Sequence, residues 1–499
     1  MSDTENAYEE LLEKIRKIRS VSEAQGVLRW DQQVMMPDAG TFSRSRQMSA
    51  LSSIYHDLLT NEKIGELLDE IDEEELMDPE KAVVREIKRE YKRATSVPNS
   101  LVAEITKTSS EAFQKWKKAK EKDEFGKFKP LLEKMVELKR EYAREIDPEA
   151  PPYSVLFQDY EPYLGLDVAE KILTQLRKDL IPFIQRIREA NIDFNDNLFS
   201  GGFPPESQES FARGLLDDLG FSWDRGRLDK SPHPFTMGTQ FDTRITTRFH
   251  DDFLNGLFST IHEFGHALYG LNLPKDEEIY GTPLAESREM TVHESQSRLW
   301  ENHIGRSKPF WRYLLPKVKE EFSGFDSTLE EAYKVVNKVK EDNPVRIQAD
   351  ELTYHLHIVL RFEMEMDLIE GDISIGDVPE VWNEKMERYL GIRPQSDAVG
   401  CLQDVHWSNG YIGYFPNYSL GSVLSAQFFE TLRKEIDNID GRIEEGEFEV
   451  IREWLRDNIH KHGKIYRTDE LIRAITGEGL KSDYFLDYAM DKYKRIYNL

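Results

Sequence analysis

Apolar side chains recur every three or four residues through long stretches of the first 145 residues, and charged residues fill most positions between them. Such spacing places the apolar side chains on one face of a helix. We therefore expect long antiparallel helices up to about residue 145. The three clearest series are Tyr8, Leu11, Leu12, Ile15 and Ile18; Leu101, Ile105, Ala112, Phe113 and Trp116; and Leu131, Leu132, Met135, Leu138, Tyr142 and Ile146.

One segment departs from the helical pattern. Residues 235–249 read FTMGTQFDTRITTRF, which is rich in Thr and Phe and partly alternates in its second half. This composition predicts a short strand or hairpin. Turn-forming residues at 147–152 and 194–205 predict loops. Because no internal repeat or low-complexity linker is visible, we expect one continuous, mostly α-helical domain over residues 1–499.

The apolar-periodic stretch 253–270 contains the run His262-Glu263-Phe264-Gly265-His266. Residues four apart share one face of a helix, so both imidazoles can reach one metal ion. The glutamate between them lies near the same point and can take a proton from water. The run therefore predicts a metal-dependent hydrolase; the alternative is a pair of histidines that only pack the helix. An exposed edge strand just before this helix could pair with an extended peptide.

Two histidines leave a catalytic zinc ion one protein ligand short, because such sites use three protein groups and an open position. Glu294 is the candidate third ligand. It follows His266 by 28 residues, after a loop that lets a second helix turn back. His293 is the rival, but neighbours on a helix point about 100° apart, so only one of the two can face the metal. We favour Glu294.

Composition narrows the class of protein further. The formal net charge is −27, which argues against nucleic acid and anionic membrane as partners. The single cysteine, Cys401, cannot form an intrachain disulfide, and this fits a reducing compartment. The first residues lack the basic and apolar segments of a secretory signal, and no apolar run approaches 18 residues. We expect a cytoplasmic protein.

Seven stretches of the chain together point to one family: 28–37, 231–235, 242–246, 262–269, 293–302, 345–357 and 403–421. They resemble the thermostable metallocarboxypeptidase family often called carboxypeptidase Taq, a group of gluzincin peptidases. The resemblance implies an almost wholly helical fold with a deep groove, a zinc ion at its floor, and a cytoplasmic homodimer. It also implies removal of single residues from peptides with a free C-terminus. We expect residues 1–145 to form one wall of the groove and residues 230–425 to form the catalytic region.

One departure from the family pattern lies between the two predicted metal helices. Residues 285–289 read AESRE, where the family usually has small residues. The ligand residues are retained, but this more charged loop leaves the preference for the C-terminal side chain open. Zinc is the metal that the resemblance implies, and cobalt suits the same ligands.

Glu263 is expected to act as general base, accepting a proton from water and passing it to the leaving amine. A carboxypeptidase must also bind the terminal carboxylate of its substrate, which a planar guanidinium does through two parallel hydrogen bonds. Arg346 is the first candidate because it begins the stretch resembling the family motif, and Arg244 is the second. The alternative is that each arginine only pairs with a nearby acid, such as Asp350 beyond Arg346.

A hydrogen-bond donor must stabilise the oxyanion that forms during attack. Tyr414 is our first candidate and Tyr418 the second, with Tyr411 in the same stretch; core packing is the alternative for each tyrosine. His406 is expected to donate to the substrate backbone. His233 is expected to line the same cleft.

Three functions remain open from the sequence alone. The first is a zinc carboxypeptidase that releases single residues. The second is a dipeptidyl carboxypeptidase or oligopeptidase on a similar helical groove, which would differ in the distance between the carboxylate-binding arginine and the metal. The third is a metal-free helical binding scaffold, against which the intact His262, Glu263, His266 and Glu294 argue.

Overall fold

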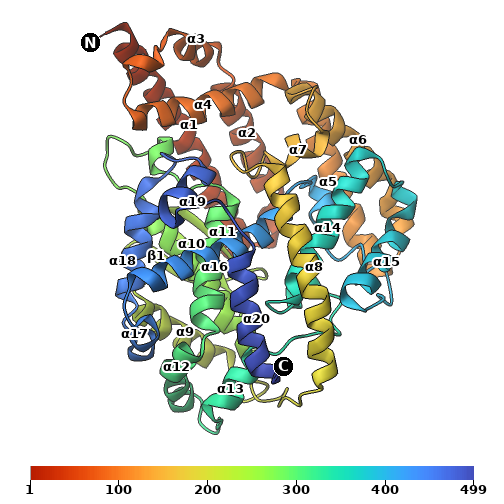
Figure 1. Ribbon diagram of the computed structural model, residues 1–499. Helices are drawn as coiled ribbons and strands as arrows, with labels where there is room; N and C mark the ends of the chain where they lie inside the picture. The colour runs from red at the N-terminus through yellow and green to blue at the C-terminus, as the bar shows by residue number, and fades with distance from the viewer. Residues whose placement is uncertain (1) are drawn as a thin grey trace.

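Helices make up most of the computed structural model, which describes residues 2–499 (Figure 1). The mostly helical fold expected from the sequence is confirmed. The helices are α1 (Asp3–Val34), α2 (Thr41–Leu59), α3 (Glu62–Glu70), α4 (Asp78–Ser96), α5 (Asn99–Lys122), α6 (Phe125–Ile146), α7 (Pro152–Phe157), α8 (Leu166–Ala190), α9 (Pro205–Leu219), α10 (Phe253–Asn272), α11 (Met290–Arg298), α12 (Lys308–Glu321), α13 (Leu329–Val336), α14 (Thr353–Glu370), α15 (Val378–Leu390), α16 (Pro416–Glu435), α17 (Ile439–Glu445), α18 (Glu449–Asn458), α19 (Thr468–Thr476) and α20 (Asp483–Tyr497). The strands are β1 (Gly226–Lys230), β2 (Phe235–Thr239) and β3 (Asp242–Thr247).

The long N-terminal helices follow the predicted apolar series. Leu11 and Ile15 of α1 are fully buried in a core shared with α3 and α4. Helices α5 and α6 pack against each other as a hairpin, since only residues 123–124 separate them. The predicted loops also fall between helices, at 147–151 between α6 and α7 and within the segment between α8 and α9.

Two further cores are larger than the one shared by α1, α3 and α4. One core joins α5–α8, α14, α15 and α20, and the other joins α9–α13 and α17–α19. Helix α16 belongs to both, because Leu420 and Val423 enter the first core while Leu424 and Phe428 enter the second. A helix shared in this way fixes the two halves of the molecule relative to each other.

A small three-stranded sheet lies against α10, in the order β1-β3-β2. Strands β2 and β3 form the antiparallel hairpin that the sequence predicts, with Thr236 opposite Ile245. Strand β1 was not predicted; it runs parallel to β3 and places Leu228 beside Ile245. Its sequence, GRLDK, has neither β-branched residues nor a regular alternation, so only the partner strand specifies it. Strand β2 is the edge strand that lies against α10.

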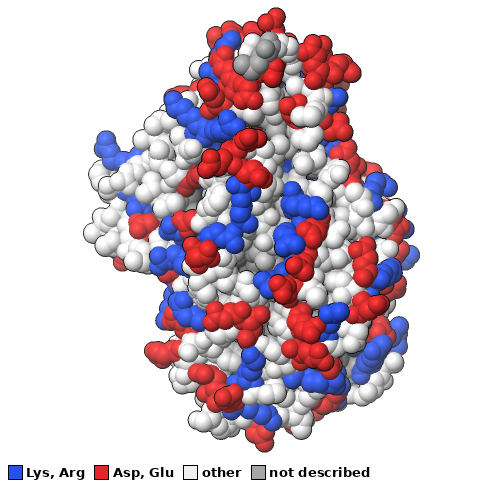
Figure 2. Space-filling model, turned by 90° about the vertical axis from the view of Figure 1, so that its left-hand side faces the viewer, with Lys and Arg blue, Asp and Glu red and all other residues white. Residues whose placement is uncertain are grey.

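Charged side chains of both signs are interspersed over the face drawn in Figure 2, with acidic residues dense at the end formed by the N-terminal helices. No helix within residues 2–499 has the length and apolar character needed to cross a bilayer.

Candidate metal centre and active site

Helix α10 carries the histidine pair and is buried on nearly every side. The side chain of Asp252 caps its first turn by accepting from the backbone N–H of Asn255. His262 and His266 lie one turn apart on one face, with ring centroids 4.9 Å apart. The spacing of the run therefore places both imidazoles on one side of the helix.

Helix α11 brings the carboxylate of Glu294 to these imidazoles. Glu294 Oε2 lies 3.7 Å from His262 Nε2 and 3.3 Å from His266 Nε2. For bonds of about 2.1 Å, tetrahedral geometry requires ligand atoms about 3.4 Å apart. All three residues offer atoms within 4.8 Å of one another, so the donor set and its spacing fit a zinc-sized cation.

His293, the rival ligand, lies beside the cluster and not within it. Its Nδ1 is 2.6 Å from Nδ1 of His266. Burial, followed by the neighbouring His266, lowers the pKa of His293 to about 3, so its ring is neutral. A neutral ring can accept the Nδ1 proton of His266 and thereby direct Nε2 of His266 toward Glu294.

Two charged residues that sequence reasoning missed brace the same cluster. Arg298 Nε donates to Glu294 Oε1 at 2.7 Å, and Glu301 Oε2 accepts from His262 Nδ1 at 2.9 Å. Arg298 also donates to Glu301 at 3.1 Å. Glu301 lies in a π-helical stretch, Leu299–Gly305, that continues α11. Such wide turns are common at functional sites, but nothing in the sequence marks this one.

Glu263 lies between α10 and the edge strand β2. The hydroxyl of Thr236 donates to Glu263 Oε2 at 2.6 Å and lies 3.0 Å from the carbonyl oxygen of Glu263. The first contact fixes one carboxylate oxygen of a residue that is only 6% exposed. The predicted hairpin therefore orients the carboxylate of the residue that follows His262.

Arg346 is buried and paired, but not with the acid considered from the sequence. Its Nε and Nη2 donate to Asp404 Oδ1 at 3.0 and 2.8 Å, whereas Asp350 instead caps the start of α14. Its Nη1 donates to the hydroxyl of Tyr354 at 3.2 Å. Although burial alone would raise it, the guanidiniums of Arg361 and Arg346 hold the pKa of Asp404 well below its usual range.

Arg244, the second arginine candidate, is held within the sheet. Its Nε and Nη2 donate to the two oxygens of Asp242 at 2.9 and 2.6 Å. Its guanidinium also stacks 4.3 Å from the ring centroid of Trp30 on α1. Arg244 therefore pairs with a nearby acid in this structure, as the alternative to carboxylate binding proposed. His233 is exposed just before β2, and its carbonyl accepts from Ser231.

The predicted tyrosines gather around His406. Tyr418 OH lies 3.4 Å from His406 Nε2, and the ring centroids of Tyr414 and Tyr418 are 5.3 Å apart. Burial lowers the pKa of His406 to about 4, so this ring is neutral at neutral pH. Burial, and then the negative charge of Glu294, raise the pKa of Tyr414 to about 12. Tyr411 is 48% exposed at the rim of the group.

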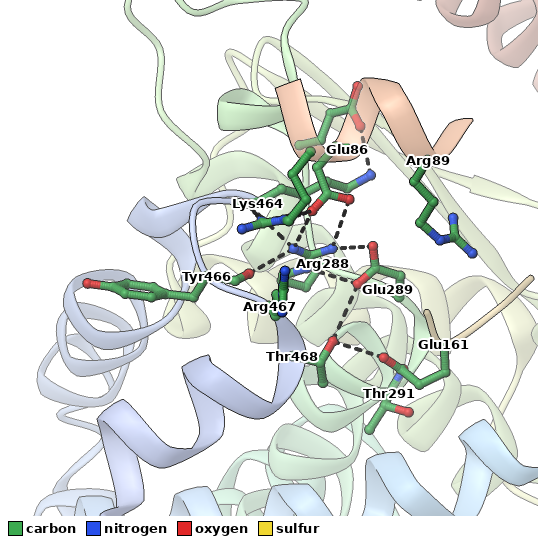
Figure 3. Close-up of polar contacts among 12 residues, drawn as sticks. Glu86, Arg89, Glu161, Arg288, Glu289, Thr291, Lys464, Tyr466, Arg467 and Thr468 are labelled. Carbon is green, nitrogen blue, oxygen red and sulfur yellow. Dashed lines mark hydrogen bonds and ion pairs between the residues drawn. The ribbon is translucent and has the colours of Figure 1, made fainter. Parts of the chain in front are cut away.

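The charged loop 285–289 directs its charges toward other parts of the protein (Figure 3). Arg288 is almost fully buried and donates to Glu86 on α4 at 3.2 Å. It also donates to Glu289 at 2.9 Å and to the carbonyl of Tyr466 at 2.7 Å. The unusual charges of this loop therefore join the N-terminal helices to the C-terminal part of the chain.

Glu161 extends this network to the helix that carries Glu294 (Figure 3). It is fully buried and accepts from the backbone N–H of Thr291, in the first turn of α11, at 3.1 Å. It also accepts from Thr468 Oγ1 at 2.9 Å. Burial, and then the charge of Glu289, raise the pKa of Glu161 to about 7.

Two imidazoles and a carboxylate around one point, with a further carboxylate beside them on a helical scaffold, define a metallopeptidase. A family profile described as carboxypeptidase Taq (M32) metallopeptidase matches residues 10–493. The chain belongs to this family and is a metallocarboxypeptidase; the oligopeptidase and scaffold alternatives are not favoured.

Relatives match over essentially the whole chain. Thermostable carboxypeptidase 1 of Thermus thermophilus is 38% identical and covers 99% of both chains. Thermostable carboxypeptidase 1 of Pyrococcus furiosus is 39% identical, covering 97% of this chain and 98% of the relative. The crystal structure of the M32 carboxypeptidase from Deinococcus radiodurans superposes with a TM-score of 0.95 at 32% identity, covering 99% of this chain and 100% of that one.

Proposed function

We propose that His262, His266 and Glu294 bind a zinc ion and that the protein removes single residues from the C-terminus of peptides. The observation that carries this proposal is the convergence of two Nε2 atoms and Glu294 Oε2 beside Glu263. Cobalt suits the same ligands and could replace zinc.

A metal ion bound there would polarise the scissile carbonyl and make an attacking water more acidic. Glu263 takes the proton of that water. Because Thr236 holds Oε2, the carboxylate uses Oε1 for this purpose. The same oxygen then delivers the proton to the leaving amine, as general acid–base catalysis requires.

Tyr414 is proposed to donate a hydrogen bond to the oxyanion. The charge of Glu294 contributes to its raised pKa, which supports a hydroxyl close to the metal ligands. A pKa of about 12 keeps this hydroxyl protonated and able to donate. Tyr418 is the second candidate, and neutral His406 is proposed to donate to the substrate backbone.

Arg346 is proposed to bind the terminal carboxylate of the substrate. Asp404 occupies its Nε and Nη2, which leaves the Nη1 side, next to Tyr354, for a ligand. Arg244 is the weaker candidate because Asp242 and Trp30 already engage it.

A deep groove is proposed to hold the peptide. Residues 1–145 would form one of its walls, and residues 230–425 would form the catalytic region. His233 and Tyr411, both exposed, would contact substrate at its rim.

Cytoplasmic location and a homodimer are also proposed. The dimer is supported by large apolar side chains exposed near the end of α1 and along α2, where Met35 is 61%, Phe42 75% and Ile54 46% exposed. Such side chains are often covered by a partner. Size-exclusion chromatography with light scattering of the wild type and of Phe42→Ser tests this assignment; a wild-type monomer would reject it.

The reaction is tested by mass spectrometry of a short peptide incubated with the metal-loaded protein. We expect a ladder that loses one residue at a time, stops on addition of chelator, and slows about 10²–10⁴-fold in Glu263→Gln. Glu277→Gln, an exposed carboxylate in the loop after α10, serves as the matched control. Loss of dipeptides or internal fragments would indicate the oligopeptidase, and no cleavage with zinc or cobalt would indicate the scaffold.

A further inference from the structure

Helix α14 carries a buried carboxylate that the proposed chemistry does not use. Glu365 is 1% exposed, and both of its oxygens accept hydrogen bonds. Trp407 Nε1 donates to Oε1 at 2.9 Å. The backbone N–H of Gly413 and the hydroxyl of Tyr153 donate to Oε2 at 2.9 and 3.0 Å. The three donors come from two separate parts of the chain and converge on one side chain.

Two of these donors lie at the ends of the loop that holds the proposed substrate-binding groups. Trp407 directly follows His406, and Gly413 directly precedes Tyr414. Gly413 has a φ of 91°, and a Cβ there would lie 2.8 Å from backbone atoms of Leu156 and Phe157. The loop is therefore pressed against α7 at the point where Glu365 binds its backbone.

Burial of a carboxylate at this position disfavours its charged form. Burial raises the pKa of Glu365 to about 7, although all three hydrogen bonds act to lower it. Glutamine has the same shape without the charge, but it offers one acceptor oxygen and one NH₂ group. Its NH₂ would face the N–H of either Trp407 or Gly413, which leaves a buried donor unpaired. Only the carboxylate satisfies both ends of the loop.

We propose that Glu365 is a positioning residue that sets Tyr414 against the metal centre by binding both ends of the loop between His406 and Tyr414. The proposal rests on the proposed function of Tyr414. Glu365 itself touches neither substrate nor metal ligands. Its effect is to hold a hydrogen-bond donor in place for the transition state, where displacement by about 1 Å costs on the order of 100-fold in rate.

The test compares Glu365→Gln with Glu363→Gln in the metal-loaded protein. Glu363 lies on the same helix and also accepts several hydrogen bonds, but from Lys385 and Tyr389, away from the loop. We expect Glu365→Gln to lower kcat roughly 10–100-fold with KM changed less than about threefold, since the lost interaction belongs to the transition state. Metal affinity should not change. Glu363→Gln should stay within about twofold of wild type in kcat and KM.

A double-mutant cycle with Tyr414→Phe separates positioning from general damage. If Glu365 acts through Tyr414, Glu365→Gln should cost less than about threefold in the Tyr414→Phe background. Equal losses in both backgrounds, or wild-type kinetics in Glu365→Gln, would overturn the proposal. Wild-type kcat in Tyr414→Phe would instead reject the oxyanion donor of the proposed function, and this proposal with it.

A second variant covers the case in which Glu365→Gln does not fold. Tyr153→Phe removes one of the three donors without adding a competing group. We expect it to lower kcat about three- to tenfold at unchanged metal affinity, because the carboxylate loses one of its restraints. An unchanged kcat in this variant would overturn the proposal.

Discussion

Glycine at position 421 allows α16 to approach α11, the helix that carries the proposed metal ligand Glu294. A Cβ added to Gly421 would lie 2.6 Å from Glu294 Cβ and 2.7 Å from Glu294 Cγ. Gly265 likewise allows α10 to approach α11, because a Cβ there would lie 2.6 Å from the carbonyl oxygen of Gln296. Helix α11 is therefore packed between two close helix contacts, and Gly421→Ala would push directly on the proposed ligand.

The size of the effect follows from these distances. Carbon atoms in contact normally lie about 3.5–4.0 Å apart, so the alanine must displace Glu294 or α16 by about 1 Å. Metal–ligand distances tolerate only about 0.2 Å. Overpacking of this kind costs about 1–3 kcal/mol. If that cost falls on the metal-bound state, affinity for zinc should drop roughly 5- to 150-fold.

Competition against a chelator of known zinc affinity measures this change, and thermal unfolding of the metal-free protein measures any strain that remains without metal. Gly214→Ala on α9 is the matched control, because a Cβ there has no heavy atom within 4 Å. It should leave zinc affinity unchanged and slightly stabilise the fold. Zinc affinity within twofold of wild type in Gly421→Ala would refute the argument that this contact positions Glu294.

Three further predictions concern residues around the site. Thr236→Val removes the hydrogen-bond donor to Glu263, the proposed general base, and should lower kcat about tenfold at constant KM, measured by steady-state kinetics. Arg288→Met leaves the buried carboxylate of Glu289 without its guanidinium partner and Glu86 with Arg85 alone, and should destabilise the fold by about 3–5 kcal/mol, measured by thermal unfolding. The folded pKa of Glu161 is raised to about 7, so its contribution to stability is present below about pH 4.5 and is lost as pH rises through 7. Melting of the metal-free proteins from pH 5 to 8 should therefore show Glu161→Gln gaining stability relative to wild type as pH increases.

Controls for these variants come from the same chain. Thr239→Val, on the same strand as Thr236, should keep wild-type kcat because its hydroxyl binds the turn between β2 and β3. Arg393→Met should melt close to the wild-type temperature because its ion pairs are exposed and screened by solvent. A pH-independent difference between Glu161→Gln and wild type, or an Arg288→Met protein as stable as the Arg393→Met control, would contradict the assignments above.

The sequence predicted those features that depend on the spacing of neighbouring residues, namely helices and side chains that share one helix face. Helical spacing predicted α1, α5 and α6, and the run from His262 to His266 predicted two imidazoles on one face. The position of Glu294 followed from the loop that precedes it. Strand β1 escaped prediction because its pairing with β3, and not its own residues, makes it a strand.

Contacts between residues far apart in the sequence could not be predicted, because tertiary packing decides them. Arg346 donates to Asp404, 58 residues away, and not to Asp350 four residues on. Arg361 of α14 donates to the same carboxylate, so Asp404 is held by two arginines that no local spacing connects to it. The brace of Glu301 on His262 likewise depends on a π-helical stretch that no residue type marks. Sequence spacing indicates which side chains can share a helix face, whereas tertiary packing decides which ones meet.

Arg298 helps to orient the side chains of the proposed metal site through contacts within the protein. Its Nε binds Glu294 Oε1, so that oxygen is directed away from the imidazoles while Oε2 is directed toward them. Glu301 and His293 occupy the Nδ1 atoms of His262 and His266, which turns both Nε2 atoms to the same point. The three proposed ligand atoms are thus oriented by hydrogen bonds within the protein. Binding of a metal ion would therefore require little further ordering of these side chains.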